Sequence, residues 1–162
     1  MTRVEYGELD TSDGDTYYWR EQLFTGIAYE LRRDGQLWTE TGFLNGQYHG
    51  PSRTWYPSGQ LQEETTSYNG LVYGPKREWD EAGQLRREAL MEYGVRVREK
   101  KWDEAGRLME EYEIAPDDPH YSWLQEAHAR YGEHPRLGPF SVEAEQGIAE
   151  KAGAAEKAAD KE

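Results

Sequence analysis

Glutamates recur along this chain at nearly constant spacing, and paired carboxylates are the groups that glycoside hydrolases use as acid and nucleophile. The recurring positions are Glu40, Glu64, Glu88 and Glu111. A catalytic pair needs two special positions, whereas this carboxylate returns in every unit of the sequence. We therefore interpret the glutamates as part of the scaffold or of an acidic face.

Histidines could also carry acid–base or metal chemistry. The chain has four, which are His49, His120, His128 and His134. His120 and His128 are eight residues apart, two helical turns, so they are too distant to act as metal ligands on adjacent turns. We interpret His128, which lies on an apolar helical face, as a packed histidine.

Other chemical signatures are missing from the sequence. There is no cysteine, which excludes disulfides and thiolate chemistry. Neither a nucleophile elbow, a zinc-protease motif nor a phosphate loop is present. Asp10, Asp13 and Asp15 do not fit a calcium loop, because the glycine is misplaced and no bidentate glutamate follows at the required spacing. The sequence therefore predicts no catalytic residues, no cofactor and no metal, and a protein that is not an enzyme.

The recurring glutamates belong to an internal repeat. Gly35, Gly59, Gly83 and Gly106 are spaced by 24, 24 and 23 residues. Other residues keep the same register around them: Leu37, Leu61, Leu85 and Leu108 two positions later, and Leu31, Trp55, Trp79 and Trp102 four positions earlier. Several positions in a shared register indicate a repeat architecture.

Turn signals within each unit identify its structure. Asn45-Gly46 and Asn69-Gly70 suit two-residue hairpin turns, which require positive φ angles. Asp34-Gly35 and Pro57-Ser58-Gly59 also read as turns. A turn about every dozen residues, with aromatic and threonine-rich segments between, predicts short antiparallel strands. The expected fold is an all-β repeat: an elongated, single-layer antiparallel β-meander over residues 17–112, with one C-terminal α-helix.

Aromatic residues supply the apolar surface of this polar chain, whose mean hydropathy is -1.06. It contains 6 Trp, 12 Tyr and 3 Phe, and each large ring can bury much area. We interpret the recurrent Trp and Leu positions as a stacked ladder that holds the sheet together.

Two stretches resemble a known family. The stretch "GPSRTWYPSGQLQEETTSYNGLVYG" resembles the second type of MORN repeat, and "FTGIAYELRRDGQLWTETGFLNGQYHG" looks like the opening unit of bacterial YwqK-type antitoxins. The resemblance covers roughly residues 17–112. It implies a single-layer antiparallel sheet and a role in protein contacts, often as the immunity partner of a toxin. Eukaryotic relatives are tied to lipids and scaffolding. Two later positions depart from the pattern: Arg98 replaces the recurrent glycine, and Tyr93 replaces the turn asparagine.

The remaining segments are assigned as follows. Residues 1–16 read as a poorly specified leader, and Tyr17 to Gly26 as a capping strand. Residues 113–140 contain a helix and an extension, with the helix from Pro119 to Tyr131 packed on the end or one face of the sheet. Its signals are Asp118 as N-cap and Gly132 at the C′ position. Residues 141–162 form a low-complexity Ala/Glu/Lys tail that we expect to be solvated.

The net charge of −13 guides the choice of partner. A nucleic-acid binder should carry a basic patch, and anionic lipid surfaces also select Lys and Arg. The charge therefore favours a basic protein partner, although acidity also serves solubility alone. No apolar stretch resembles a signal peptide or membrane span, so we expect a cytoplasmic protein.

These observations predict an antitoxin or immunity protein that covers a basic toxin, with a structural or self-assembling scaffold as the alternative and membrane association less favoured. Contact residues are expected among aromatic side chains outside the ladder, with neighbouring acids, because Tyr and Trp are the usual interface anchors. The candidates are Trp38, Tyr48, Tyr56, Tyr68, Tyr73, Glu40 and Glu64. The sequence does not specify the oligomeric state.

Overall fold

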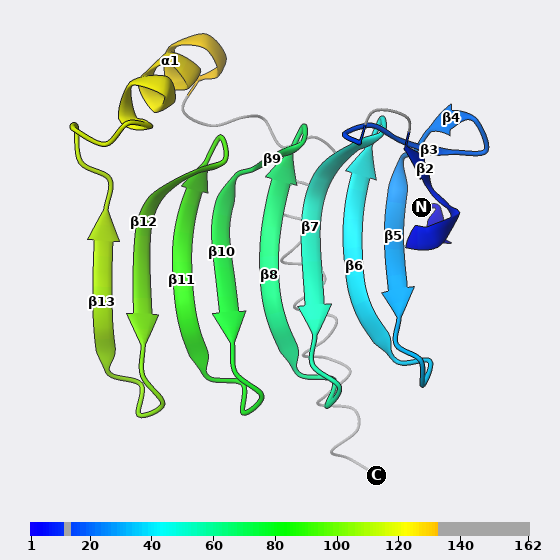
Figure 1. Cartoon of the computed structure of the whole chain (residues 1–162), viewed down its shortest axis with the longest axis horizontal. Helices are drawn as coiled ribbons and strands as arrows, with labels where there is room; N and C mark the ends of the chain where they lie inside the picture. The colour runs from blue at the N-terminus through cyan, green and yellow to red at the C-terminus, as the bar shows by residue number, and fades with distance from the viewer. Residues whose placement is uncertain (12–13, 133–162) are drawn as a thin grey trace.

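The computed structural model of this protein describes residues 1–11 and 14–132. It is dominated by one ten-stranded sheet with the strand order β1-β5-β6-β7-β8-β10-β11-β12-β13, and β9 pairs with β8 (Figure 1). The successive strands are β5 (Gly26–Leu31), β6 (Leu37–Leu44), β7 (Gln47–Trp55), β8 (Leu61–Tyr68), β9 (Leu71–Val72), β10 (Gly74–Trp79), β11 (Leu85–Glu92), β12 (Val95–Trp102) and β13 (Leu108–Glu113). From β5 to β13 every pairing is antiparallel, which confirms the predicted meander.

The upper turns in Figure 1 have the backbone that a two-residue hairpin requires. Asn45 and Asn69 have φ angles of 50° and 46°, and each is followed by a glycine of positive φ. Tyr93 takes the same conformation at φ 50° although it is not an asparagine. The glycine of each turn also donates its N–H to a carbonyl in the preceding unit, for example Gly70 to Tyr48 at 2.9 Å. The turns therefore connect neighbouring units as well as reversing the chain.

The lower end of every hairpin carries a β-bulge at the same place. The register shifts there leave one extra residue on the second strand, opposite a single residue of the first. Just below each shift, the recurrent apolar residues face one another across the hairpin: Leu31 and Leu37, Trp55 and Leu61, Trp79 and Leu85, Trp102 and Leu108. The recurrent Trp and Leu positions thus form cross-strand pairs.

The N-terminal segment forms a cap at one end of the sheet. β1 (Arg3–Glu5) pairs with β5 in parallel, and the turn η1 (Tyr6–Glu8) follows it. Residues 1–11, which we expected to act as a leader, therefore contribute a strand and the buried side chain of Val4.

The predicted capping strand is also arranged differently. β2 (Asp10–Thr11), β3 (Tyr17–Trp19) and β4 (Gln22–Leu23) form a separate three-stranded sheet. The physical reason is the tight turn at Arg20 and Glu21, which have φ angles of 52° and 66° and fold β4 back onto β3. Aromatic residues of this small sheet pack onto Phe43, which is fully buried.

The C-terminal helix α1 (Tyr121–Tyr131) caps the other end, at the upper edge of the sheet. It begins two residues later than predicted, because Asp118 accepts the N–H of His120 in a turn before the helix. Gly132 has φ 88° and donates its N–H to His128, which confirms it as the C-terminal cap. Leu124 and Ala127 are the buried residues of the helix, and they pack against Tyr93.

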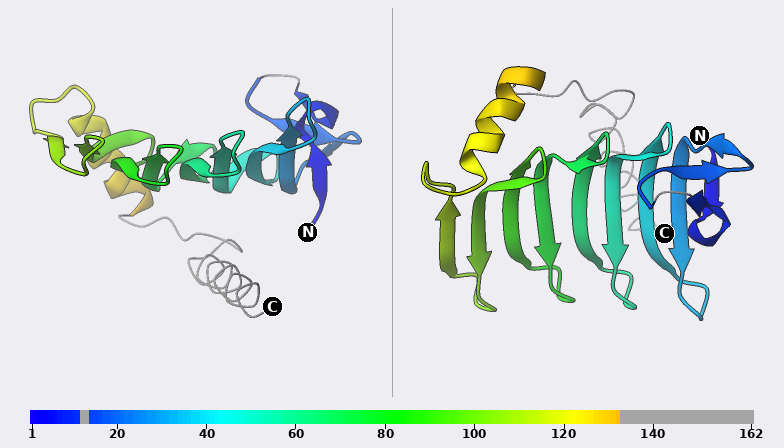
Figure 2. Two further views of the ribbon diagram at one scale, coloured as in Figure 1. Left: turned by 90° about the horizontal axis from the view of Figure 1, so that it is seen from below. Right: turned by 45° about the horizontal axis from the view of Figure 1, so that its top comes forward.

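The middle of the sheet is a single layer (Figure 2). Of the eight buried apolar residues in the described part, seven belong to two clusters, one at each capped end, and only Ala89 lies outside them. The predicted tail, residues 141–162, and residues 133–140 lie outside the described residues.

Candidate protein-interaction surface

Charged side chains form one continuous row across a face of the sheet. We call these residues the charge row: Glu40, Arg53, Glu64, Arg77, Glu88, Lys100 and Glu111. Each is the register partner of the next, so they share one face and alternate in sign.

Most members of the charge row bond within their own hairpin. Arg53 donates to Glu64 at 2.6 Å, Arg77 donates to Glu88 at 2.7 Å, and Lys100 lies 3.3 Å from Glu111. Glu40 forms its ion pair with Arg3 of the N-terminal cap. Exposed pairs of this kind contribute about 0.2–1 kcal/mol each. The glutamates that could resemble a catalytic set are therefore held in cross-strand ion pairs.

The basic members of this row were not recognised from the sequence. Arg53, Arg77 and Lys100 are spaced by 24 and 23 residues, the same intervals that the glutamates show. Their pairing became visible only when the register placed them opposite the glutamates. The repeat spacing was the signal that could have identified them.

A second row on the same face is apolar. Trp55 lies two residues beyond Arg53 on its strand, and Trp79 lies two beyond Arg77, so each ring shares the face of the charge row. We call this row the aromatic strip: Leu31, Trp55, Trp79 and Trp102 with their cross-strand partners Leu37, Leu61, Leu85 and Leu108.

None of the strip residues is fully buried. The three Trp rings are partly buried, whereas Leu31 and Leu108 are 45% and 49% exposed. A hollow of about 420 Å³ opens on the strip between two neighbouring units. Its lining includes Leu85, Trp102, Glu104 and Ala105. The strip therefore holds the hairpins in register and also presents apolar surface to a ligand.

Trp38 is the one predicted contact aromatic that is exposed, at 42%. It is the extra residue of the first bulge, next to Leu37 of the strip. The Arg32 guanidinium lies 5.5 Å from its ring centre. The predicted acids Glu40 and Glu64 lie in the charge row, so Trp38 and Glu40 are close neighbours on β6.

The four predicted tyrosines serve internal packing. The Tyr48 hydroxyl bonds to those of Tyr6 and Tyr17 at 2.9 and 2.7 Å. Burial is the main cause that raises the pKa of Tyr48, and the bond to Tyr17 raises this pKa further. The other three make the following contacts: Tyr56 donates to the Trp79 carbonyl at 2.9 Å, the Tyr68 ring lies tilted against that of His49 with centroids 5.2 Å apart, and Tyr73 meets Tyr93 edge-on at 5.2 Å. The structure thus disperses the predicted set, and its role in partner binding stays a prediction.

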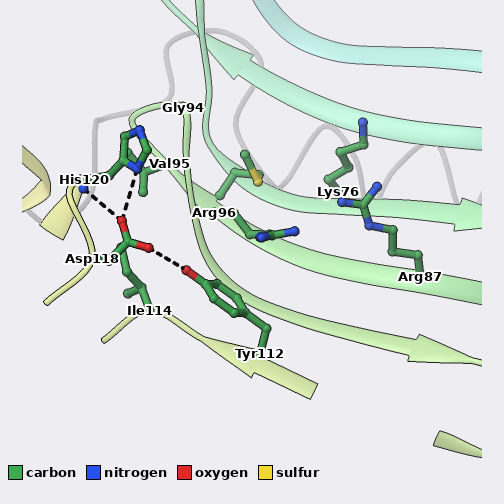
Figure 3. A pocket seen from close by; sticks show the side chains of 10 residues that line it. Lys76, Arg87, Gly94, Val95, Arg96, Tyr112, Ile114, Asp118 and His120 are labelled. Carbon is green, nitrogen blue, oxygen red and sulfur yellow. Dashed lines mark hydrogen bonds and ion pairs between the residues drawn. The ribbon is translucent and has the colours of Figure 1, made fainter. Parts of the chain in front are cut away.

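The opposite face has a more polar hollow of about 420 Å³ (Figure 3). Lys76, Arg87 and Arg96 lie on one side of it, and Asp118 bonds to Tyr112 and His120 on the other. The three cations are matched by carboxylates: Lys76 by Glu63 at 3.2 Å, Arg87 by Glu78 at 2.8 Å and Glu99 at 2.5 Å, and Arg96 by Glu99 at 2.9 Å. This hollow therefore has its charges already balanced.

Glu99 is the one buried carboxylate in the described part of the chain, with a side chain only 1% exposed. Burial alone raises its pKa, but the hydrogen bond from Arg87 and the charges of Arg87, Arg96 and Lys101 lower the pKa below its usual value. Glu99 is therefore held as an anion at neutral pH and fixes three cations around it.

The chain matches the family model described as a MORN repeat variant over residues 48–69, which are β7, its turn and β8. A repeat of this kind indicates a protein-interaction or scaffold module. The comparisons with curated proteins and with solved structures found no match, so no relative supports the resemblance to YwqK-type antitoxins. In the described residues, no helix combines the length and apolar character needed to cross a membrane.

Proposed function

We propose that this chain is a non-catalytic protein-binding module, and that it acts as an antitoxin or immunity protein against a toxin with a basic surface. The observation that carries the proposal is the aromatic strip, an apolar row left open on one face of a single-layer sheet. Monomeric proteins seldom leave such rows without a binding role. The MORN repeat match supports the coarser part, a module for protein contacts.

Charge supports the choice of a basic partner. Residues 1–75 carry 11 acidic and 5 basic side chains, whereas residues 76–112 carry 10 and 9. The negative field is therefore stronger over the first hairpins than over residues 76–112, and Trp38 is exposed there. Such a field steers a basic protein toward this end of the sheet, and the flat sheet then covers the toxin surface sterically.

The alternative function is a scaffold that assembles through its sheet edge. β13 is the final strand of the sheet order and offers its outer edge for pairing. Its side chains include Glu110, Glu111 and Glu113, and charges on an edge strand oppose pairing with a second copy. Edge charge thus favours the antitoxin over self-assembly.

The test uses the full chain and the protein encoded beside it in the genome. Co-expression should suppress the toxicity of that neighbour, and the purified proteins should associate at a rate that falls at least about tenfold from low to high salt. Trp38→Ala should weaken the complex without lowering the melting temperature. Trp123→Ala is the matched control, because Trp123 is 44% exposed but lies on α1.

An association rate that is indifferent to salt would contradict the electrostatic part of the proposal. A neighbour that is harmless, or a chain that elutes as a large homo-oligomer and binds no neighbour, would favour the scaffold instead.

A further inference from the structure

The spacing of the aromatic strip selects one kind of polypeptide ligand. Trp55, Trp79 and Trp102 lie on alternate strands, so neighbouring rings are separated by two inter-strand distances, about 9.6 Å. A polyproline II helix advances about 3.1 Å per residue with three residues per turn, a repeat of about 9.3 Å. An extended strand repeats about every 6.8 Å and an α-helix every 5.4 Å. Of these three repeats, that of polyproline II lies nearest the ring spacing and places one equivalent residue against each ring.

The rings also offer the hydrogen-bond donors that this ligand needs. A polyproline II backbone makes no internal hydrogen bonds, so its carbonyls seek donors, and aromatic-lined grooves are its usual docking sites. Trp79 and Trp102 are partly exposed, and within residues 1–11 and 14–132 their indole N–H groups have no hydrogen-bond partner. The hollow beside Trp102 provides room for one side chain of the ligand.

Charged residues beside the strip indicate which charged side chains the ligand carries. Glu81 and Glu104 occupy equivalent positions in consecutive lower turns, 23 residues apart, and both are exposed. Neither makes an ion pair with the described part of the chain. Glu104 lines the hollow next to Trp102. A ligand lying across the strip therefore meets free carboxylates at the same interval as the rings, which favours Lys or Arg at every third position.

We propose that the aromatic strip binds an extended proline-rich segment that carries basic residues and lies across the strands in polyproline II conformation. The inference rests on the proposed function only in that the partner is a protein; it does not require the partner to be a toxin. Nothing in the described fold covers the strip, because α1 lies at the opposite edge of the sheet (Figure 1).

The first experiment compares two capped peptides of equal length and charge, four repeats of Pro-Pro-Arg and four repeats of Gly-Ser-Arg. Calorimetric titration into the full chain should give saturable binding for the proline peptide. The flexible peptide should bind at least about tenfold more weakly, because it loses more conformational freedom on binding. Equal affinities for the two peptides would overturn the conformational part of the proposal, and no binding of the proline peptide would overturn all of it.

The second experiment removes the donors but keeps the rings. Trp79→Phe combined with Trp102→Phe should weaken binding of the proline peptide about thirtyfold, since the two lost hydrogen bonds contribute about 1 kcal/mol each. Trp123→Phe is the control and should change nothing. Glu81→Gln with Glu104→Gln should weaken binding and reduce its salt dependence. Thermal melts of every variant show whether it is folded, and unchanged affinity in both double variants would overturn the assignment of the site.

These outcomes separate this inference from the proposed function. If the neighbouring toxin binds the Trp79→Phe/Trp102→Phe variant as tightly as the parent chain, the indole donors take no part in toxin binding and the antitoxin proposal stands. If the proline peptide binds and the neighbour does not, the antitoxin proposal fails and the strip assignment stands.

Discussion

The two ends of the sheet and its middle are stabilised by different interactions. At the ends, rings are buried against a cap: Phe43 is 0% exposed under the small N-terminal sheet, and Tyr93 is 6% exposed under α1. In the middle, Trp79 is only partly buried, and ion pairs such as that of Arg77 and Glu88 cross the open face. The middle therefore depends on pairing between neighbouring strands, and the ends depend on burial.

This difference follows from the geometry of a repeat array. Each hairpin contacts only its neighbours, so a middle unit has a partner on both sides, whereas a terminal unit lacks one and needs a cap. A cap packs on each end of the array, although the outer edge of β13 stays unpaired, and the middle faces are left open. An open face is what a binding module requires, and the five predictions below test this division.

Phe43→Ala should have the largest effect, a loss of about 3–5 kcal/mol in unfolding free energy, because it opens a cavity in the N-terminal cluster. Phe43 contacts the rings of Tyr6, Tyr17, Phe24 and Tyr48. The loss is measured by urea denaturation, with tryptophan fluorescence as the signal for unfolding. A value below about 1 kcal/mol would show that the ends are no better packed than the middle.

Tyr93→Asn should have the second-largest effect, a loss of about 2–4 kcal/mol in unfolding free energy. The substitution restores the asparagine of the other turns but removes the ring under α1 and the bond from its hydroxyl to the Gly132 carbonyl at 2.5 Å. Far-UV circular dichroism should show loss of helix while the β signal persists. Tyr93→Phe, which keeps the ring, should lose only about 1 kcal/mol. An unchanged helix signal in the asparagine variant would mean that α1 does not need this cap residue.

Glu99→Gln tests the buried charge that lies outside both clusters. At neutral pH the variant should be about 1.5–3 kcal/mol less stable, because charged hydrogen bonds from Arg87 and Arg96 are weakened. The folded pKa of Glu99 lies below its ordinary value of 4.5, so its stabilisation is complete above pH 4.5 and is lost as pH falls through the folded pKa. The difference between variant and parent should therefore shrink in acid. A difference that is constant with pH would rule out the ionised carboxylate as its source.

Trp79→Ala should lower the unfolding free energy by less, about 1–2 kcal/mol. The Trp79 ring is only partly buried, so its removal abolishes fewer contacts than the removal of a ring enclosed in a core. The sequence alone allowed a fully buried ladder, for which the same change is expected to lose about 3–5 kcal/mol. Measuring it under the conditions used for Phe43→Ala compares the middle with the end directly. Equal losses in the two variants would contradict the division drawn above.

The smallest effect is expected for the ion pair of Arg77 and Glu88, whose side chains are 40% and 42% exposed. A double-mutant cycle to alanine should give a coupling of about 0.2–1 kcal/mol that weakens in salt. The pair of Arg53 and Glu64, with side chains 21% and 27% exposed, is the matched comparison and should couple somewhat more strongly. A coupling well above this range would mean that the charge row contributes to stability as much as a core residue.

Much of the fold was predictable because the repeat encodes local structure. Asn45-Gly46 and Asn69-Gly70 specify hairpin turns by their tolerance of positive φ, and the constant spacing fixes the strand lengths between them. Tyr93 was the exception: it adopts the turn conformation without being a favoured residue. Its ring packs under α1, and a contact with so distant a segment cannot be read from one hairpin.

The candidate site was predicted only in part. Trp38 is exposed as expected, but Tyr48 and Tyr73 lie in the two end clusters. Their sequence context gave no sign of burial, because the residues that cover them come from distant segments, the N-terminal residues for Tyr48 and α1 for Tyr73.

By itself, the sequence determined the period, the turns, the antiparallel meander and the C-terminal helix, because these depend on residues near one another in the chain. The tertiary structure alone decided which residues are buried, which glutamate faces which arginine, and which face stays open. Those properties depend on register and on the caps, which join residues far apart in the chain, such as Tyr6 and Tyr48, 42 positions apart. A repeated sequence places the same side chain in every unit, but only the caps make the first and last units different from the middle.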